Sequence, residues 1–223
     1  MIQVAETVRM IYPGTHAGFL AMSGVSNPGE APALEAEKAA LEQALRARLG
    51  GLDRPALEAY GLLPAYAAYY KAFGKTYHVR GQLESVVLKG RALPRVAALV
   101  EAMFMAELKN LVLTAGHDRD ALNGTVCVNV ATGTETYTTM RGQDQVLKAD
   151  DLYMTDAAGV ISSILYGPDK RTAITSATTR VLFACYAPPG VPVDAVNGHL
   201  ADIRDYVLLV SPGARIERLE VLG

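Results

Sequence analysis

Residues 114–139 read TAGHDRDALNGTVCVNVATGTETYTT and mark the place where the chain changes from helix-forming to strand-forming sequence. An apolar helical pattern precedes this stretch, and short strands separated by turns follow it. We expect Gly116 to let the backbone turn, and Asn123-Gly124 supplies residues that tolerate positive φ just before β-branched residues begin to alternate. The stretch therefore predicts a polar corner between a helix and a sheet, a candidate place for a small ligand.

The composition describes a well-buried globular chain. Half of its 223 residues are hydrophobic, and its formal net charge of −2 gives no general attraction to nucleic acid or to an anionic membrane. Cys127 and Cys185 fall in expected strands without metal-ligand spacing, so we expect reduced thiols and no metal site. The sequence has neither a leader-like N-terminus nor an apolar run long enough to span a bilayer, which favours a cytoplasmic protein without membrane contact.

Hydrophobic periodicity and turn residues divide the chain into expected elements. The expected helices are residues 32–49, 54–60, 64–73, 77–89, 94–109 and 193–210. The expected strands are residues 2–11, 19–25, 125–130, 135–140, 144–147, 151–155, 159–166, 181–186 and 214–222. Helices fill most of the first half and strands most of the second, so the pattern predicts an α+β fold with a β-rich C-terminal half.

Two groups of side chains allow a structural and a functional interpretation. Tyr66, Tyr69, Tyr70 and Phe73 recur at three- and four-residue steps, which is more typical of a helix buried in the core than of a base-stacking platform. Residues 71–100 carry six basic residues and one acid, a net charge of +5 inside an otherwise acidic chain. The basic group predicts phosphate contacts; its alternative is a pair of solvated helix faces. Its candidate RNA-binding residues are Arg80, Lys89, Arg91 and Arg95.

No nucleophile elbow, phosphate loop, dinucleotide fingerprint or zinc-spaced Cys/His set occurs, and we expect no cofactor. His117 stands out among four histidines because Asp118 is adjacent and Gly116 leaves room beside it. A second polar cluster, residues 169–179, combines a carboxylate, two cations and several hydroxyls ahead of a buried strand. This cluster predicts a phosphate or carboxylate site, or equally a capped turn at a sheet edge.

The order and spacing of short motifs between Lys75 and Pro189 resemble the B3/B4 domain, the tRNA-editing domain of the phenylalanyl-tRNA synthetase beta subunit. Free-standing proteins made of this domain alone are more similar still. The motifs that carry the resemblance are Leu93-Pro94-Arg95-Val96, Leu99-Val100-Glu101-Ala102, residues 116–124, Thr134-Glu135-Thr136-Tyr137, Asp150-Asp151-Leu152, residues 156–160 and residues 174–183. The resemblance covers about half of the chain.

The resemblance implies a β-sandwich-like core with flanking helices and an N-terminal α/β extension. It also implies a pocket that hydrolyses the ester of a mischarged aminoacyl-tRNA. The chain departs from the synthetase editing site at two places. The editing-site His of the synthetase stands three residues before the Asp, where this chain has Ala115, and its Gly-Gly-Glu loop is replaced here by residues 166–169. An activated ester needs mainly a positioned water and donors for the oxyanion, so these departures do not exclude hydrolysis.

The leading hypothesis is a free-standing protein that binds tRNA or an aminoacyl ligand and deacylates it in trans. The alternative is a non-catalytic amino-acid or small-molecule binding domain that does not bind RNA. We expect an extension, residues 1–74, packed on a B3/B4-like domain, residues 75–223. The catalytic candidates are His117, Asp118, Asp169 and Thr175, and the ligand-binding candidates are Gly116, Lys170, Arg171, Thr172 and Thr178.

Overall fold

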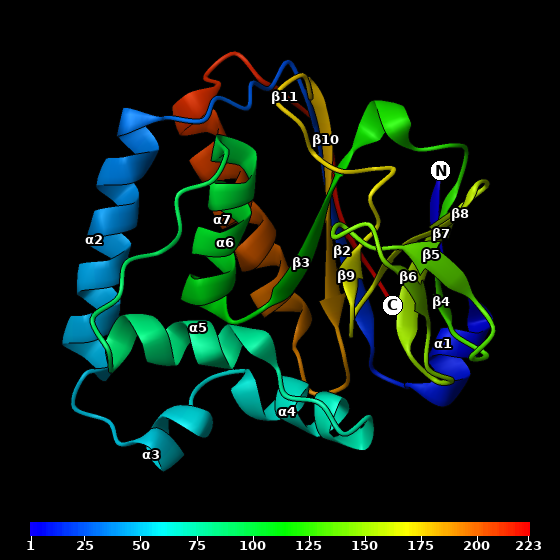
Figure 1. Cartoon of the computed structure of the whole chain (residues 1–223), viewed down its shortest axis with the longest axis horizontal. Helices are drawn as coiled ribbons and strands as arrows, with labels where there is room; N and C mark the ends of the chain where they lie inside the picture. The colour runs from blue at the N-terminus through cyan, green and yellow to red at the C-terminus, as the bar shows by residue number, and fades with distance from the viewer.

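Two β-sheets lie beside each other in the computed structural model, which describes residues 1–223, and helices cover the outer face of one of them (Figure 1). The four-stranded sheet has the order β11 (Arg215–Leu222), β2 (His16–Ser23), β10 (Arg180–Ala187) and β3 (Leu113–Asp118). The five-stranded sheet has the order β1 (Ile2–Val4), β4 (Val126–Val130), β7 (Leu152–Asp156), β8 (Gly159–Ser163) and β9 (Gly167–Pro168). A separate hairpin joins β5 (Thr136–Thr138) to β6 (Asp144–Val146).

Most helices form a layer against the four-stranded sheet and a base beneath it, while the first helix packs against β4. Their bounds are α1 (Glu6–Ile11), α2 (Pro32–Leu49), α3 (Arg54–Glu58), α4 (Leu63–Ala72), α5 (His78–Val87), α6 (Ala98–Asn110) and α7 (Val193–Val210). A 3-10 turn, η1 (Arg119–Ala121), follows β3. In Figure 1, α2, α6 and α7 stand on the side of the four-stranded sheet that faces away from the five-stranded sheet, while α4 and α5 cross below. The fold is α+β, as the sequence predicts.

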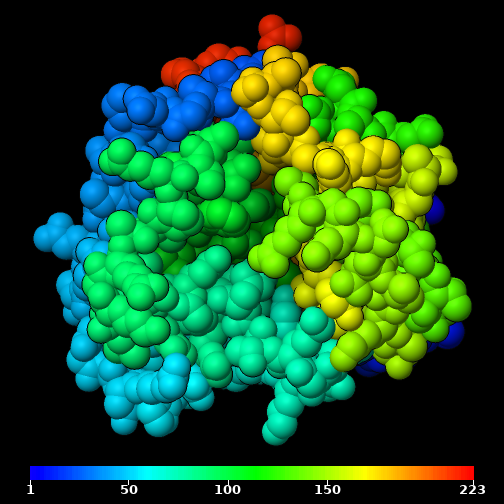
Figure 2. Space-filling model, in the orientation of Figure 1, coloured from blue at the N-terminus to red at the C-terminus, as the bar shows by residue number.

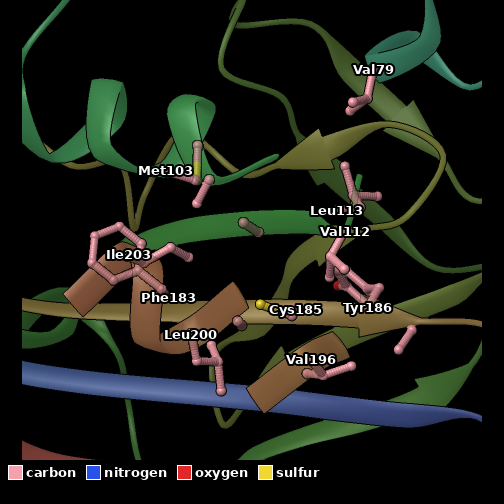
Figure 3. Close-up of a cluster of buried hydrophobic side chains, with 14 of the residues drawn as sticks. Val79, Met103, Val112, Leu113, Phe183, Cys185, Tyr186, Val196, Leu200 and Ile203 are labelled. Atoms are coloured by element: carbon pink, nitrogen blue, oxygen red, sulfur yellow. The ribbon is translucent and has the colours of Figure 1, made fainter. Parts of the chain in front are cut away.

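The core is continuous from the helices through both sheets. A single cluster of 51 buried residues includes Leu200 and Ile203 of α7, Phe183 of β10 and Val128 of β4. Figure 3 shows Ile203 of the last helix, residues 193–210, beside Phe183 of β10, and Leu200 and Val196 of the same helix between β10 and β2. Burying these side chains contributes about 1.5–3 kcal/mol each relative to leaving them in water.

The aromatic side chains of α4 belong to this core, which confirms the core interpretation of their spacing. The Tyr66 ring stacks on Tyr77 with 4.3 Å between ring centroids. The Tyr66 hydroxyl donates to the Tyr186 carbonyl of β10 at 2.5 Å. Tyr70 donates to the Ile164 carbonyl at 2.5 Å. A buried tyrosine needs such a partner for its hydroxyl, and these bonds attach α4 to the strands.

Gly18 lets α7 approach β2 closely. A Cβ atom built on Gly18 would clash with Val196 Cγ1 and would lie 3.2 Å from Leu200 Cδ1. We expect Gly18→Ala to lower the unfolding free energy by about 1–3 kcal/mol in denaturant titrations, because overpacking a close contact displaces side chains or backbone. Adding Val196→Ala should recover part of that stability. Gly29→Ala is the matched control, because no atom lies within 4 Å of its Cβ position.

The two longest predicted helices are confirmed with the bounds expected from the sequence. α2 begins at Pro32, which fixes a helical φ where no hydrogen bond is lost, and its last turn carries Arg46 and Arg48. α7 has Asp194 in its first turn and a buried stripe that includes Val196, Leu200 and Ile203. Both helices therefore combine terminal residues that favour a helix end with one apolar face.

Two predictions of local structure are wrong. Residues 2–11 form the short strand β1 and then α1, rather than one strand. The alternation of Val8 and Met10 misleads because Val8 is buried while Met10 is exposed, and so short an apolar run does not separate strand from helix. Residues 113–118 form β3 rather than a turn. Gly116 sits in mid-strand, where a glycine allows another segment to approach closely.

Residues 1–74 contribute strands to both sheets. β2 lies between β11 and β10, and β1 pairs in parallel with β4. The division of the chain after residue 74 stays a prediction, and no break in the core accompanies it. None of the helices combines the length and the apolar character that a membrane-spanning helix requires.

Candidate functional site

A cavity of about 410 Å³ opens at the free edge of β3. β3 is the last strand of its sheet, so only its β10 side is paired. Helices α5 and α6 border the cavity on one side and residues 163–174 on the other, and Figure 2 shows the hollow between these segments. The apolar walls include Val100, Met103, Phe104, Leu113, Ile164 and Ile174. The side chains with polar groups at the cavity are His78, Glu107, Thr114, Ser163, Tyr166 and Tyr186.

Backbone groups of β3 face this cavity. The Thr114 N–H donates to Glu107 Oε1 at 2.7 Å, and the Asp118 N–H donates to the Thr172 carbonyl at 2.8 Å. Both residues therefore turn their backbone groups away from β10, and the antiparallel register gives Gly116, midway between them, the same orientation. The Gly116 N–H therefore points from the free edge toward the cavity, and it donates to no turn, loop or side chain of the protein.

The missing side chain at Gly116 keeps this part of the cavity open. A Cβ atom there would lie 2.7 Å from Ile174 Cδ1 and 3.5 Å from Met103 Sδ. Any larger residue would push Ile174 out of its place in the cavity wall. The exposed N–H and the room beside it together form a place where a ligand carbonyl oxygen could accept a hydrogen bond.

Glu107 is the acidic side chain of the cavity. It is only 1% exposed, and Oε1 accepts the Thr114 N–H, whereas Oε2 has no hydrogen-bond partner in the protein. Burial raises the pKa of Glu107 to about 8, although the hydrogen bond from Thr114 opposes this shift. In the empty cavity the carboxyl group is therefore mostly protonated at pH 7.

A buried polar cluster supports the inner wall of the cavity. Thr114 Oγ1 lies 2.6 Å from His199 Nε2 of α7 and 3.4 Å from Cys185 Sγ of β10. Burial lowers the pKa of His199 to about 4, so its imidazole is neutral, and burial raises the pKa of the Cys185 thiol to about 12. The cluster ties α7, β10 and β3 together without adding a charge.

His117 lies beside the cavity edge but does not line it. Its side chain is fully buried, with Nδ1 2.7 Å from Thr172 Oγ1. The Thr172 hydroxyl donates to Asp169, so the hydrogen between His117 and Thr172 sits on Nδ1, and the unpartnered Nε2 carries a lone pair. Burial, followed by the charge of Arg171, lowers the pKa of His117 to about 4. Burial raises the pKa of Asp169.

The remaining predicted polar residues form turns and ion pairs around this group. Asp118 accepts hydrogen bonds from the Thr178 hydroxyl at 2.7 Å and from the Asp120 N–H at 3.0 Å. Thr175 is exposed, and its hydroxyl oxygen accepts the Ala177 N–H. Arg171 pairs with a carboxylate of β7, and the Lys170 side chain is exposed. These bonds are typical of a capped turn at a sheet edge.

The structure therefore brings the two predicted polar segments together, but they contact each other beside the cavity and their polar side chains do not line it. Residues 117–118 and 169–178 bond to each other directly. Of the predicted catalytic and ligand-binding residues, only Gly116 lines the cavity. The catalytic roles of His117, Asp118, Asp169 and Thr175 stay predictions, as do the ligand contacts of Lys170, Arg171, Thr172 and Thr178.

The four predicted RNA-binding cations divide into two pairs. Arg80 lies 3.1 Å from Glu58 and 3.5 Å from Glu84, and Arg95 lies 3.3 Å from Glu35. Lys89 and Arg91 are exposed and form no ion pair. The acids of neighbouring elements thus neutralise half of the group, while two cations stay available to an anionic partner.

Sequence reasoning missed the polar residues at the cavity. Glu107 lies in the apolar run of α6 between buried Ala106 and Leu108. A carboxylate at a core position of a helix is a signal for a functional or paired group, because burying an unpaired charge is costly. His78 also lines the cavity, and although it is exposed as a whole residue, the surrounding protein desolvates the ring and lowers its pKa.

The two sheets, the helical layer and the cavity at a sheet edge define an α+β protein with a concave, mostly apolar site. The chain belongs to the B3/4 domain family, whose sequence profile matches residues 65–198, more than half of the chain. This finding confirms the resemblance seen in the sequence.

Two proteins that are similar to this chain support the same family relationship. A stretch of 66 residues is 39% identical to the phenylalanine–tRNA ligase beta subunit of Tropheryma whipplei (strain Twist); it is 30% of this chain and 7% of that protein. The crystal structure of an N-terminal fragment of the phenylalanyl-tRNA synthetase beta subunit from Pyrococcus horikoshii superimposes with a TM-score of 0.56 at 12% identity, covering 97% of this chain and 50% of the fragment. The latter likeness shows the fold alone. This chain is thus a domain related to part of a tRNA synthetase subunit.

Proposed function

We propose that the cavity at the β3 edge binds the aminoacyl end of an aminoacyl-tRNA and that the protein hydrolyses the ester in trans. The observation that carries this proposal is the Gly116 N–H at the free edge of β3, which faces a mostly apolar cavity of about 410 Å³. Cavities of this size and composition are typical of small-ligand sites. The family relationship to the synthetase beta subunit supports an aminoacyl ligand.

We assign a role to each part of the cavity. The apolar wall formed by Phe104, Ile164 and Ile174 takes the amino-acid side chain. The Gly116 N–H donates to the ester carbonyl oxygen and binds it more strongly as negative charge develops there. Water adds to the carbonyl carbon and gives up a proton to solvent, the bond to the nucleotide oxygen breaks, and that oxygen takes up a proton from solvent as it leaves. An activated ester requires no protein nucleophile for this reaction.

The neighbouring polar group contributes by holding the strand. The bond from the Asp118 N–H to the Thr172 carbonyl fixes β3 two residues beyond Gly116. The contacts from His117 to Thr172 and from Thr172 to Asp169 hold residues 169–172 beside the same part of β3. We therefore assign these residues a positioning role beside the reacting ester, in place of direct contact with it.

Incubation of the protein with a panel of mischarged aminoacyl-tRNAs tests the proposal. At least one ester should be hydrolysed faster than in the absence of protein. We expect Gly116→Ala to slow that hydrolysis on the order of tenfold, because the new methyl group drives Ile174 Cδ1 into the ligand's space and displaces the ester. The thermal unfolding midpoint should change little, since the Cδ1 atom is the mobile end of its side chain.

The rescue variant makes this result specific. Ile174→Val removes the Cδ1 atom that the methyl group introduced by Gly116→Ala would meet, so the Gly116→Ala, Ile174→Val double variant should regain most of the rate. Hydrolysis at this cavity would be excluded if every mischarged tRNA were hydrolysed only at the rate seen without protein. Full activity of the Gly116→Ala variant would exclude it as well.

For the tRNA itself, Lys89 and Arg91 are the best-placed phosphate ligands because neither is paired with an acid. We expect a Lys89→Glu, Arg91→Glu variant to weaken tRNA binding for all sequences alike. The slope of log affinity against log salt should become shallower by about one unit for each phosphate that is no longer bound. Arg95→Glu is the control with a smaller expected effect, since Arg95 already pairs with Glu35. Salt-independent binding would exclude this surface from the tRNA interface.

A second candidate function is the binding of an amino acid or a related small molecule without RNA. The pairing of Arg80 and Arg95 with acids favours it, because few cations are left for a phosphate backbone. Thermal-shift measurements with free amino acids and with tRNA separate the two candidates, since only a bound ligand stabilises the fold by mass action. Stabilisation by an amino acid together with no stabilisation by tRNA would select this second function.

A further inference from the structure

Glu107 places one carboxyl oxygen, Oε2, in a mostly apolar cavity and leaves it without a partner in the protein. Its Oε1 is held by the Thr114 N–H at 2.7 Å, which fixes the carboxyl group, while Oε2 bonds to no protein group. The walls of the cavity that it lines leave only 1% of the residue exposed. Oε2 is not fully enclosed by protein atoms, so a ligand in the cavity can reach it. Covering this oxygen is costly unless the ligand supplies a hydrogen-bond partner, so its position points to a ligand group that bonds to it.

The surroundings contain no basic side chain that could serve as the partner. The titratable groups that face Glu107 from the elements packed against it are Tyr66, Tyr70, Tyr77, His78, Cys185 and, through Thr114, His199. Burial raises the pKa of the tyrosines and the thiol and lowers the pKa of both histidines, so these groups are neutral above pH 7. A counter-ion for Glu107 must therefore come from the ligand.

We propose that the cavity is specific for ligands that carry a primary ammonium group on an apolar body, and that the Glu107 carboxylate is the counter-ion of that ammonium group. An ammonium group has three hydrogens to donate, and Oε2 accepts one of them. The carbonyl of Gly116, which faces the cavity from the free edge of β3, offers a further acceptor. The inference rests on the proposed function and deepens it, since an aminoacyl ester is a ligand of this class.

The protonation of Glu107 gives this specificity a measurable signature. The pKa of about 8 means that the empty cavity holds the neutral acid at pH 7, while the bound ammonium requires the carboxylate. Binding therefore releases a proton. The affinity should rise with pH by about tenfold per unit below the pKa and level off above it, because the ionised fraction does so. A ligand that accepted a hydrogen bond from the neutral acid would show the opposite pH dependence.

Calorimetric titration between pH 6 and pH 9 tests the proposal with 2-phenylethylamine, whose alkylamine stays charged over most of this range as a lysine side chain does. The matched neutral probe is 2-phenylethanol. We expect the amine to bind more tightly than the alcohol above pH 7. Titrations at pH 7 in buffers of different ionisation enthalpy should show the release of close to one proton per bound amine.

Glu107→Gln removes the charge and keeps the acceptor for the Thr114 N–H. This variant should bind the amine at least about tenfold more weakly at pH 8 and show no proton release, with 2-phenylethanol binding unchanged. His78→Asn should retain the rise in affinity above pH 7, since His78 is already neutral there. Equal binding of amine and alcohol by the wild-type protein, or proton uptake on amine binding, would overturn the proposal even if the variant did not fold. Because no ester is used, this outcome is independent of the aminoacyl-tRNA hydrolysis assay.

Discussion

An Asp151→Ala variant is expected to lose about 3–5 kcal/mol of unfolding free energy at pH 5, measured by denaturant titration. Asp151 is fully buried and accepts hydrogen bonds from the Tyr69 hydroxyl at 2.9 Å and from the Ser163 hydroxyl at 2.5 Å. Truncation leaves both buried donors without an acceptor, at about 1–3 kcal/mol for each. It also removes one of the bonds that attach α4 to the segment before β7.

The pH dependence identifies the cause. Burial raises the pKa of Asp151 from 3.8 to about 7, so the folded protein favours the neutral acid. A raised pKa of an acid means that stability falls as pH increases from the unfolded value toward the folded one. The stability advantage of the wild type over Asp151→Asn should therefore shrink by about 3 kcal/mol between pH 5 and pH 8.

An exposed acid provides the comparison for Asp151. Asp205 pairs only with its neighbour Arg204, and its side chain is 59% exposed. Asp205→Ala should change stability by less than about 1 kcal/mol at either pH. If the difference between wild type and Asp151→Asn did not vary with pH, the raised pKa of Asp151 would be wrong.

The parts of the fold that the sequence predicts correctly are those where local and long-range preferences agree. In α7, Asp194 lies in the first turn and the apolar stripe recurs at helical spacing over 18 residues, so tertiary contacts only reinforce the helix. The strands from β4 to β8 follow turn residues that require positive φ, such as Gly124 and Gly142. Such signals lie in adjacent residues and can be found without knowing the rest of the structure.

The errors occur where a distant contact decides the local structure. Gly116 is typical of a turn when only its neighbours are considered, but it forms a strand because Phe183 pairs with it and Ile174 packs where its side chain would be. The strand predicted over residues 2–11 is likewise limited to β1, the three residues that pair with β4, and the chain then continues as α1. In both cases the deciding residue is far away along the chain.

The candidate site divides in the same way. Residues 114–118 belong to the strand that borders the cavity, and Gly116 lines it, yet the side chains of the catalytic candidates His117 and Asp118 face elsewhere. Strand alternation accounts for His117, because neighbouring residues of a strand point to opposite faces of the sheet. Asp118 shares the face of Gly116 but lies beyond the cavity, where the Thr178 hydroxyl donates to it. Glu107 is absent from the sequence predictions because its role depends on a cavity that α6 and β3 form together.

A second buried carboxylate, Asp156, should behave in the opposite sense to Asp151. Its side chain is buried, Arg171 donates to both of its oxygens at 2.8 and 3.0 Å, and the Asn123 and Ala158 N–H groups donate to it as well. We expect Asp156→Ala to lower the unfolding free energy by about 3–5 kcal/mol at pH 7, because it leaves Arg171 and two backbone donors without their acceptor. The matched control is Asp120→Ala, which breaks the exposed pair with Arg180 at the same 2.8 Å separation and should cost about 1 kcal/mol or less.

Acid titration distinguishes the pairing of Asp156 from a simple loss of packing. Burial alone would raise its pKa, but the hydrogen bonds from Arg171, Asn123 and Ala158 outweigh burial and lower it. A lowered pKa means that the stabilisation is complete above the unfolded pKa and is lost as pH falls through the folded value. The difference between wild type and Asp156→Ala should therefore narrow from pH 7 to pH 3, whereas the difference for Asp151→Asn narrows as pH rises. A double-mutant cycle with Arg171→Met should give a coupling energy above about 1.5 kcal/mol at pH 7 that declines in acid. A coupling energy near zero would mean that the Arg171 pair contributes nothing to holding β7 against the segment that faces Gly116.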